Sequence, residues 1–185
     1  KIVLITLNQQ GFLEMRNALK EKLSEADIQV IADEIINPGE QDFRSVVAKT
    51  MAKEPELYIL LFFSPELDIV TKQIREAKIT QPITSMLSFG FSTQPELYEG
   101  LWFVDSIEAK GNFYDRFKKR FGREAQVGSP NAYDIVNLLV YGFEQTFAQG
   151  KPSSAQVVQT LQSVKDFDGM LGTLSIDEKG AVFSP

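Results

Sequence analysis

Strand-like and helix-like patterns of apolar residues alternate along the first half of the chain. The run KIVLITL at residues 1–7 is continuously apolar and rich in β-branched residues, which predicts a buried strand. Four further runs have strand character, at residues 28–36, 57–63, 82–87 and 100–105. The run LYILLFF at 57–63 shows no alternation of polar and apolar positions, which indicates burial on both faces, as in a parallel sheet covered by helices.

Apolar residues at helical spacing predict a helix after each of the first three strands. The expected apolar faces are Phe12, Met15, Leu19 and Leu23, then Phe43, Val46, Val47 and Met51, then Leu67, Val70, Ile74 and Ala77. The alternation of strands and helices predicts an α/β fold with a doubly wound, mainly parallel sheet and helices on both faces. Sheets of this kind bind ligands at the carboxyl ends of their strands.

Helices dominate the structure expected for the second half. One spans about 110–122, a long one spans about 132–147, and a third follows a cap at Ser153 or Ser154. The first of these helices is rich in aromatic residues, and three rings lie one turn apart on it. We interpret these three residues as core and not as a ligand site: Phe113, Phe117 and Phe121.

A β-hairpin is expected at the end of the chain, between residues 175 and 183. Gly180 can take the positive φ that a type I turn followed by a G1 bulge requires. The sequence has no internal repeat, low-complexity segment or linker, so we expect residues 1–185 to form a single α/β lobe. Lys1 begins a strand at once, and we therefore expect a trimmed or processed piece of a longer protein.

Composition and charge restrict the partners of the chain. The formal net charge of −6 disfavours nucleic acid, which requires a basic stripe, and it also disfavours an anionic lipid surface. No apolar run approaches the roughly 20 residues of a membrane span. The absence of cysteine excludes disulfides and is compatible with the cytosol and with the periplasm.

Most common types of catalytic site are excluded because the chain contains neither histidine nor cysteine. A Ser-His-Asp triad, a cysteine nucleophile and the usual zinc ligands are therefore missing. The segment GKPSS at 150–154 lacks the spacer and leading glycine of a phosphate loop, and NQQGF after the first strand lacks the G-x-G-x-x-G pattern. No pair of carboxylates is placed in an apolar cleft. We expect no catalytic residue, no metal and no cofactor.

Three stretches of sequence are informative as an ordered set. The first is NPGEQDFRSVVAKTMAKEPELYILLFF, where an Asp-Phe pair opens a helix that leads to an apolar strand. The second is SPNAYDIVNLLVYGFEQ, a helix that begins with Tyr133 and Asp134. The third is FDGMLGTLSIDEKGAVF, with Phe167, Gly169, Gly172, Asp177 and Gly180. In this order and spacing they resemble the second lobe of type I periplasmic binding proteins, in the branched-chain amino-acid receptor family.

The resemblance implies that the chain is one lobe of a two-lobed receptor. In that family a small molecule binds between the lobes, closure accompanies binding, and the receptor delivers its cargo to an ABC permease in the membrane. The implied partners are a small-molecule ligand, the first lobe of the same receptor and the permease, with no nucleic acid. The implied location is periplasmic or otherwise extracytoplasmic.

The candidate ligand-binding residues follow the expected strands or open the long helix. They are Asn8, Gln9, Phe12, Phe63, Ser64, Ser88, Phe89, Asp105, Ser106 and Tyr133. Phe12, Phe63 and Phe89 are expected to form a largely apolar wall. Amino-acid receptors of the family hold the ligand ammonium with an acidic residue after strand four, but the corresponding segment TSMLSFG contains no acidic residue. The family pattern also has an aromatic residue after strand three, and Phe63, which stands at this position, carries no hydroxyl group. We therefore expect either an amino acid or an apolar or aromatic carboxylate as ligand.

Two other functions stay open at the level of sequence. A freestanding α/β domain could act as an enzyme through an Asp/Glu acid–base pair. A sensor domain of the same fold, without a role in transport, has the same sequence signature, because fold does not determine function.

Overall fold

The computed structural model describes residues 1–105, 107–147 and 150–183. The chain forms two compact units, Lys1–Ser106 and Ile107–Pro185. The single lobe expected over residues 1–185 stays a prediction, and each unit is described by itself.

The first unit contains a four-stranded sheet that is parallel throughout. Its strands are β1 (Ile2–Leu7), β2 (Val30–Ile36), β3 (Leu57–Leu61) and β4 (Ile83–Thr84), in the order β2-β1-β3-β4. The mainly parallel α/β fold expected from the alternating pattern is confirmed.

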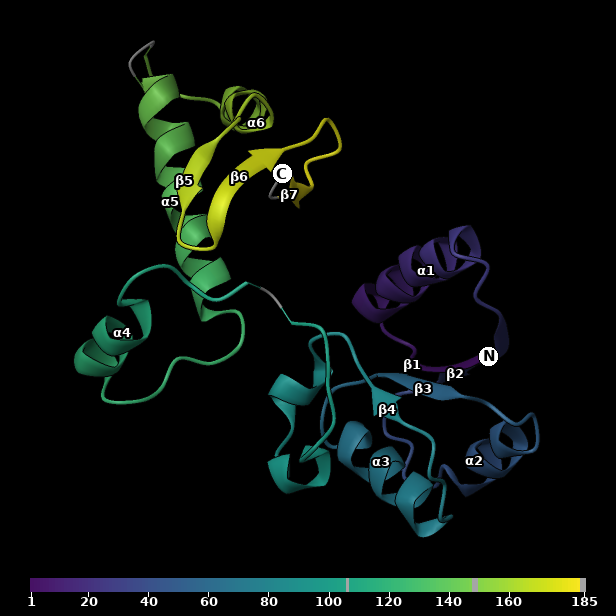
Figure 1. Cartoon of the computed structure of the whole chain (residues 1–185). Helices are drawn as coiled ribbons and strands as arrows, with labels where there is room; N and C mark the ends of the chain where they lie inside the picture. Colours follow the sequence, from purple (N-terminus) through teal and green to yellow (C-terminus); the bar gives the residue numbers. More distant parts are fainter. Residues whose placement is uncertain (106, 148–149, 184–185) are drawn as a thin grey trace. The chain divides into compact units, whose positions relative to one another are not determined.

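Three helices connect the strands and cover both faces of this sheet. α1 (Gln10–Glu25) lies on one face, and α2 (Arg44–Met51) and α3 (Glu66–Glu76) lie on the other (Figure 1). From β1 the chain moves outward to β2, and it then crosses over β1 to place β3 on its other side. The winding therefore reverses between β1 and β3, and this reversal is the position where open α/β sheets bind ligands.

The core of the first unit is built on the two central strands. All six residues of β1 are buried, as are the last four of β3, which agrees with the lack of alternation in their sequences. Phe12 and Leu23 from α1, Phe43 and Val47 around α2, and Leu67, Val70 and Ile74 from α3 pack against the strands. Each such side chain stabilises the fold by about 1.5–3 kcal/mol through removal of apolar surface from water.

Several sequence expectations for this unit differ from the structure. Residues 100–105 contribute only an isolated bridge between Met86 and Val104, and the strand expected at 82–87 shortens to β4. Trp102 and Val104 are exposed, so this run is not covered by a second layer that would stabilise a longer strand. Met51 and Ala77, which were assigned to apolar helix faces, are also exposed: Met51 is the last residue of α2, and Ala77 follows the last residue of α3.

The second unit combines helices with a small antiparallel sheet. Its elements are α4 (Phe113–Phe121), α5 (Ser129–Phe147), α6 (Ser154–Gln162), β5 (Phe167–Gly169), β6 (Gly172–Ile176) and β7 (Val182–Phe183). The strands β5 and β6 lie beside α5 and α6 (Figure 1). Leu138, Val164, Leu174 and Ile176 form the buried cluster between them.

Local signals in the second unit are mostly confirmed. Ser153 caps α6, because its Oγ accepts the Gln156 N–H and the Gln156 side chain accepts the Ser153 N–H. The closing hairpin forms, and Gly180 has a φ of 85°. The core interpretation of the α4 rings holds for Phe113, which is buried, but is wrong for Phe121, which is 56% exposed.

A half-buried ion-pair network predicts a pH-dependent stability for the first unit. Asp33 on β2 accepts hydrogen bonds from Arg16 and Lys20 on α1, with Arg16 Nε and Lys20 Nζ each 2.6 Å from a carboxylate oxygen. Burial acts to raise the pKa of Asp33, but these two cations outweigh it and hold that pKa below its ordinary value. The stabilisation is therefore complete above the unfolded pKa of about 4 and is lost as the pH falls through the lower folded pKa.

We expect Asp33→Asn to reduce the free energy of unfolding at pH 7 by about 1–3 kcal/mol. Urea unfolding of the wild type and the variant between pH 7 and pH 2.5 measures this difference. The difference should shrink as the pH falls, because the wild-type carboxyl becomes protonated. A difference that stays constant over this range would contradict the assignment.

Candidate functional site

A cavity of about 230 Å³ lies in the first unit where the winding of the sheet reverses. Its lining comes from the segment after β1 and the first turns of α1, from a single residue that follows β3 and from the segment after β4. The lining residues are Gln9, Gly11, Phe12, Met15, Phe63, Leu87 and Phe91. We call this cavity the switch-point pocket. It occupies the edge of the sheet that the fold class predicts for a ligand.

Three aromatic rings form a continuous wall of the switch-point pocket. The ring centroids of Phe12 and Phe63 are 4.5 Å apart, and those of Phe63 and Phe91 are 5.1 Å apart in an edge-to-face arrangement. Phe12 is buried, whereas Phe63 and Phe91 are each 37% exposed. The wall is therefore anchored in the core at Phe12 and presents its other two rings to the cavity.

The wall differs from the sequence expectation at one position. Phe12 and Phe63 lie together as predicted, but Phe89 does not line the switch-point pocket. Its ring is buried, with centroids 4.4 Å from Tyr98 and 5.5 Å from Phe103. The segment S88–F91 forms a short 3₁₀ turn, which directs the two rings of the SFGF sequence to different places. Phe91 thus takes the position expected of Phe89.

The backbone at the mouth of the switch-point pocket is held in tight turns. The Gln9 N–H donates to the Leu7 carbonyl at 2.7 Å, and the Ser88 N–H donates to the Met86 carbonyl at 2.8 Å. The second turn places Leu87 at a φ of 64°, a left-handed conformation that is unusual for a bulky residue. Strained residues of this type collect at ligand sites, where the surrounding structure holds them in place.

The switch-point pocket carries no formal charge. Its seven lining residues include one amide side chain, that of Gln9, and are otherwise apolar or glycine. An acidic group for a ligand ammonium is absent from this set, as the segment TSMLSFG led us to expect. The pocket is therefore suited to the apolar part of a ligand.

The other candidate residues of the first unit lie beside the pocket or away from it. Asn8 is exposed, and its amide donates to the Asn37 side chain at 2.9 Å. Ser64 is half-buried and donates to Asp68, while Ser88 is buried with its Oγ 3.3 Å from the Met86 carbonyl. Asp105 is exposed, and Ser106 lies outside the described residues. Their assignment as ligand-binding residues stays a prediction.

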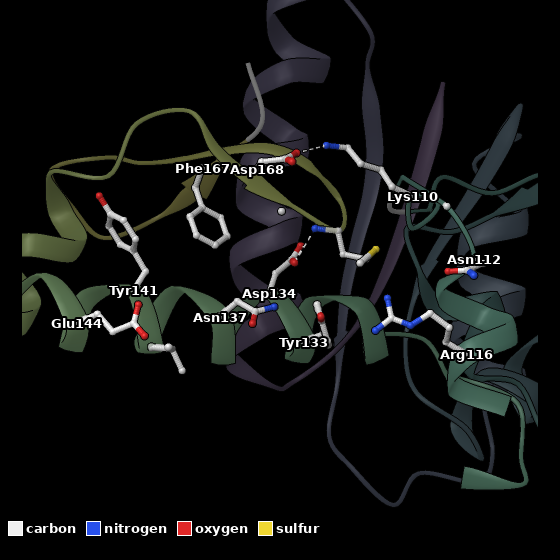
Figure 2. A pocket seen from close by; sticks show the side chains of 14 residues that line it. Lys110, Asn112, Arg116, Tyr133, Asp134, Asn137, Tyr141, Glu144, Phe167 and Asp168 are labelled. Carbon is white, nitrogen blue, oxygen red and sulfur yellow. Dashed lines mark hydrogen bonds and ion pairs between the residues drawn. The ribbon is translucent and has the colours of Figure 1, made fainter. Parts of the chain in front are cut away.

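A second, larger cavity of about 620 Å³ lies within the second unit (Figure 2). α5 forms its floor, β5 and the following turn form one wall, and the segment around the start of α4 forms another. Its chemistry mixes aromatic rings with both signs of charge, and the labelled lining residues are Lys110, Asn112, Arg116, Tyr133, Asp134, Asn137, Tyr141, Glu144, Phe167 and Asp168.

Two of the acidic groups in this cavity already have structural partners. Asp134 is buried, and its two carboxylate oxygens accept the N–H groups of Met170 at 2.6 Å and Leu171 at 2.9 Å. Asp168 pairs with Lys110 at 2.7 Å, and this cation lowers the pKa of the Asp168 carboxyl. Asp134 therefore anchors the β5–β6 hairpin, whereas the Asp168–Lys110 pair is exposed to solvent.

Tyr133 is the candidate residue that the structure places in the second unit. It is 41% exposed, lines the larger cavity, and contacts Phe113 edge-to-face with ring centroids 5.8 Å apart. Its role in ligand binding stays a prediction.

Sequence reasoning missed several lining residues of both cavities. Met15 was assigned to the core because it shares the helical spacing of Phe12, and Phe91 was overlooked as the second ring of SFGF. Lys110, Arg116 and Asn137 carried no sequence signal, because only the packing of α4, α5 and β5 brings them together.

Other kinds of site find no support in the part of the chain that the structure describes. Among residues 1–105, 107–147 and 150–183, no group of three or more acidic side chains is arranged to hold a metal ion. Of the helices in these ranges, none combines the length and the apolar character needed to cross a bilayer.

Comparison with known proteins relates the chain to binding proteins in both the family model and a curated relative. The model of the periplasmic binding protein family matches residues 1–184. A Leu/Ile/Val-binding protein homologue from Brucella melitensis is 22% identical over 92% of this chain and 48% of its own length. The chain therefore spans about half the length of the curated relative that it matches.

Two solved structures illustrate the likeness in fold. A leucine-binding protein from Thermotoga maritima superposes with a TM-score of 0.83 at 22% identity, over 98% of this chain and 54% of that one. A solute-binding protein of an ABC transporter from Rhodopseudomonas palustris, in complex with 3,4-dihydroxybenzoic acid, gives 0.75 at 14% identity, over 97% and 52%. With the family model covering almost every residue, the chain belongs to the periplasmic binding protein family.

Proposed function

We propose that the chain is the ligand-binding portion of a solute receptor for an ABC transporter. The observation that carries this proposal is the switch-point pocket, an uncharged cavity with a wall of three phenylalanines at the ligand-binding edge of a parallel sheet. Family membership supports the same function, and the curated relative is itself described as a binding protein.

The pocket chemistry favours a ligand with a substantial apolar or aromatic part. Stacking and edge-to-face contacts with Phe63 and Phe91 would recognise a branched aliphatic chain or a planar ring. Structural relatives include a leucine-binding protein and a protein in complex with 3,4-dihydroxybenzoic acid, so both classes occur within this fold. We propose an amino acid or an apolar or aromatic carboxylate, with its polar end held outside this pocket.

The remaining partners follow from the same proposal. A further lobe of the receptor would close over the exposed rings, and an ABC permease would accept the cargo. The location would be periplasmic or otherwise extracytoplasmic, in keeping with the family. We propose a binding protein and not an enzyme, since the switch-point pocket lacks any side chain able to transfer a proton at neutral pH.

The test is isothermal titration of the full-length gene product and of the 185-residue chain with L-leucine, L-isoleucine, benzoate and 3,4-dihydroxybenzoate. We expect at least one solute to bind the full-length protein saturably and to be recovered chemically unchanged. The 185-residue chain should bind it more than about 100-fold more weakly, because loss of roughly 3 kcal/mol of contacts has that effect.

Two outcomes would count against the proposal. Absence of saturable binding by any of the four solutes would contradict the ligand class. Equally tight binding to the 185-residue chain alone would contradict a ligand shared between two lobes.

A further inference from the structure

A buried carboxylate lies directly behind the aromatic wall of the switch-point pocket. Asp68, in the first turn of α3, is only 2% exposed. Its Oδ1 accepts hydrogen bonds from Ser92 Oγ at 2.6 Å and from the Tyr98 hydroxyl at 2.8 Å. Its Oδ2 accepts from Ser64 Oγ at 2.8 Å, from Thr93 Oγ1 at 2.9 Å and from the Thr93 N–H at 3.2 Å.

The arrangement of these donors is unusual for a buried acid. All five hydrogen bonds that Asp68 accepts from the described residues come from neutral groups, and none comes from a cation. Burial acts to raise the pKa of Asp68, but the hydroxyl donors outweigh it and the pKa lies below its ordinary value. The carboxylate is thus kept ionised by hydroxyl groups that must all point toward it.

The donors come from two segments that are distant in the sequence and that both carry the aromatic wall. Ser64 directly follows Phe63, and Ser92 directly follows Phe91. The two rings meet edge-to-face with centroids 5.1 Å apart, although they are 28 positions apart in the chain. One carboxylate therefore binds the side chain of the residue that follows each ring.

We propose that Asp68 is the positioning residue of the switch-point pocket, setting the relative placement of Phe63 and Phe91 and hence the shape of the apolar cavity. Asp68 does not line the cavity and acts only through the residues next to the two rings. The importance of this geometry for ligand binding rests on the proposed function.

The chemistry of the cluster predicts how a substitution acts. Asparagine has nearly the same size as aspartate, but it replaces one acceptor oxygen by an NH₂ donor. If the NH₂ faces Thr93, the Thr93 N–H loses its acceptor. If the NH₂ faces Ser92 and Tyr98, both hydroxyls must turn from donating to accepting, so the contacts that hold the 92–93 segment weaken in either orientation. Asp68→Asn should therefore release the 92–93 segment, and with it Phe91, while the core residues around α3 stay in place.

The experiment uses the 185-residue chain with 4-fluorophenylalanine incorporated at position 63 and followed by ¹⁹F NMR. We expect Asp68→Asn to shift and broaden this resonance without any ligand. The matched control is Asp134→Asn, which alters an equally buried carboxylate in the second unit and should leave the resonance unchanged. Ser92→Ala, which removes a single donor on the far segment, should move the resonance of position 63 in the same direction as Asp68→Asn.

Binding measured on the full-length protein separates this proposal from the proposed function. For L-leucine or 3,4-dihydroxybenzoate, whichever the wild type binds, Asp68→Asn should weaken affinity about tenfold. An unchanged ¹⁹F resonance in both Asp68→Asn and Ser92→Ala would overturn the positioning role whatever the ligand. Failure of the wild type to bind any solute would overturn the proposed function. The ¹⁹F measurement, which needs no ligand, would still decide whether Asp68 positions Phe63. If Asp68→Asn does not fold, the ¹⁹F resonance of position 63 is compared in Ser64→Ala and Ser92→Ala, and we expect it to shift in both.

Discussion

Phe63→Ala is expected to weaken ligand binding to the full-length protein by about 10- to 100-fold, as loss of a phenyl contact removes roughly 1.5–3 kcal/mol of apolar burial. Phe63 is the central ring of the wall, in contact with Phe12 on one side and Phe91 on the other. Removing it also leaves Phe91 without its edge-to-face partner, so the cavity loses both a wall and its shape. Isothermal titration with the solute that the wild type binds measures the effect.

Phe103→Ala provides the matched control for this prediction. Phe103 is 38% exposed, against 37% for Phe63, and lies in the same unit, but it packs on Phe89 and does not line the switch-point pocket. We expect its replacement to leave affinity within about twofold, as for a site that shares no contact with the ligand. Equal losses in the two variants would show that the apolar surface in general, and not this pocket, determines binding.

Asp134→Ala is expected to destabilise the second unit by about 3 kcal/mol, since it leaves two N–H groups of the hairpin turn without an acceptor. The carboxylate is 3% exposed and is the acceptor for both Met170 and Leu171. Figure 2 shows it directed from α5 toward the backbone of the β5–β6 turn. The thermal midpoint and the hydrogen-exchange rates of the amides at positions 170 and 171 report the loss.

The control for Asp134 is a second aspartate of the same hairpin region. Asp168 is exposed and pairs with the exposed Lys110, and a solvated pair of this kind contributes little to stability. Asp168→Ala should therefore leave the thermal midpoint almost unchanged. A comparable loss in both variants would refute the assignment of Asp134 as the anchor of the hairpin.

The Asp134 anchor also explains a glycine that the sequence motif contains. A Cβ at Gly169 would lie 2.8 Å from Asp134 Oδ2 and 2.7 Å from Leu174 Cδ1, both closer than such contacts occur. The Tyr-Asp helix and the Phe-x-Gly strand, which are separate motifs in the sequence, are thus two sides of one contact. Only the folded structure makes this relation visible.

The sequence by itself determined the class of the fold and most of the elements of the first unit, although not the extent of its last strands. Two local patterns were sufficient: the uninterrupted apolar runs of β1 and β3, and the helical spacing of apolar residues around Phe12 and Leu67. The structure agrees with both patterns because these apolar residues are buried in the core of the first unit. From these patterns the edge where open α/β sheets bind ligands could be predicted, and Gln9, Phe12 and Phe63, which were expected there, line the switch-point pocket.

Only the tertiary structure decided which rings reach the pocket and what holds them there. Phe89 and Phe91 are equivalent in the sequence SFGF, but the 3₁₀ turn sends the first into the core and the second to the cavity. Asp68 looks in the sequence like an ordinary acidic residue in the first turn of a helix, yet it accepts hydrogen bonds from Ser92 and Thr93, about 25 residues further along the chain. Such roles depend on contacts between distant segments, and side-chain periodicity carries no information about those contacts.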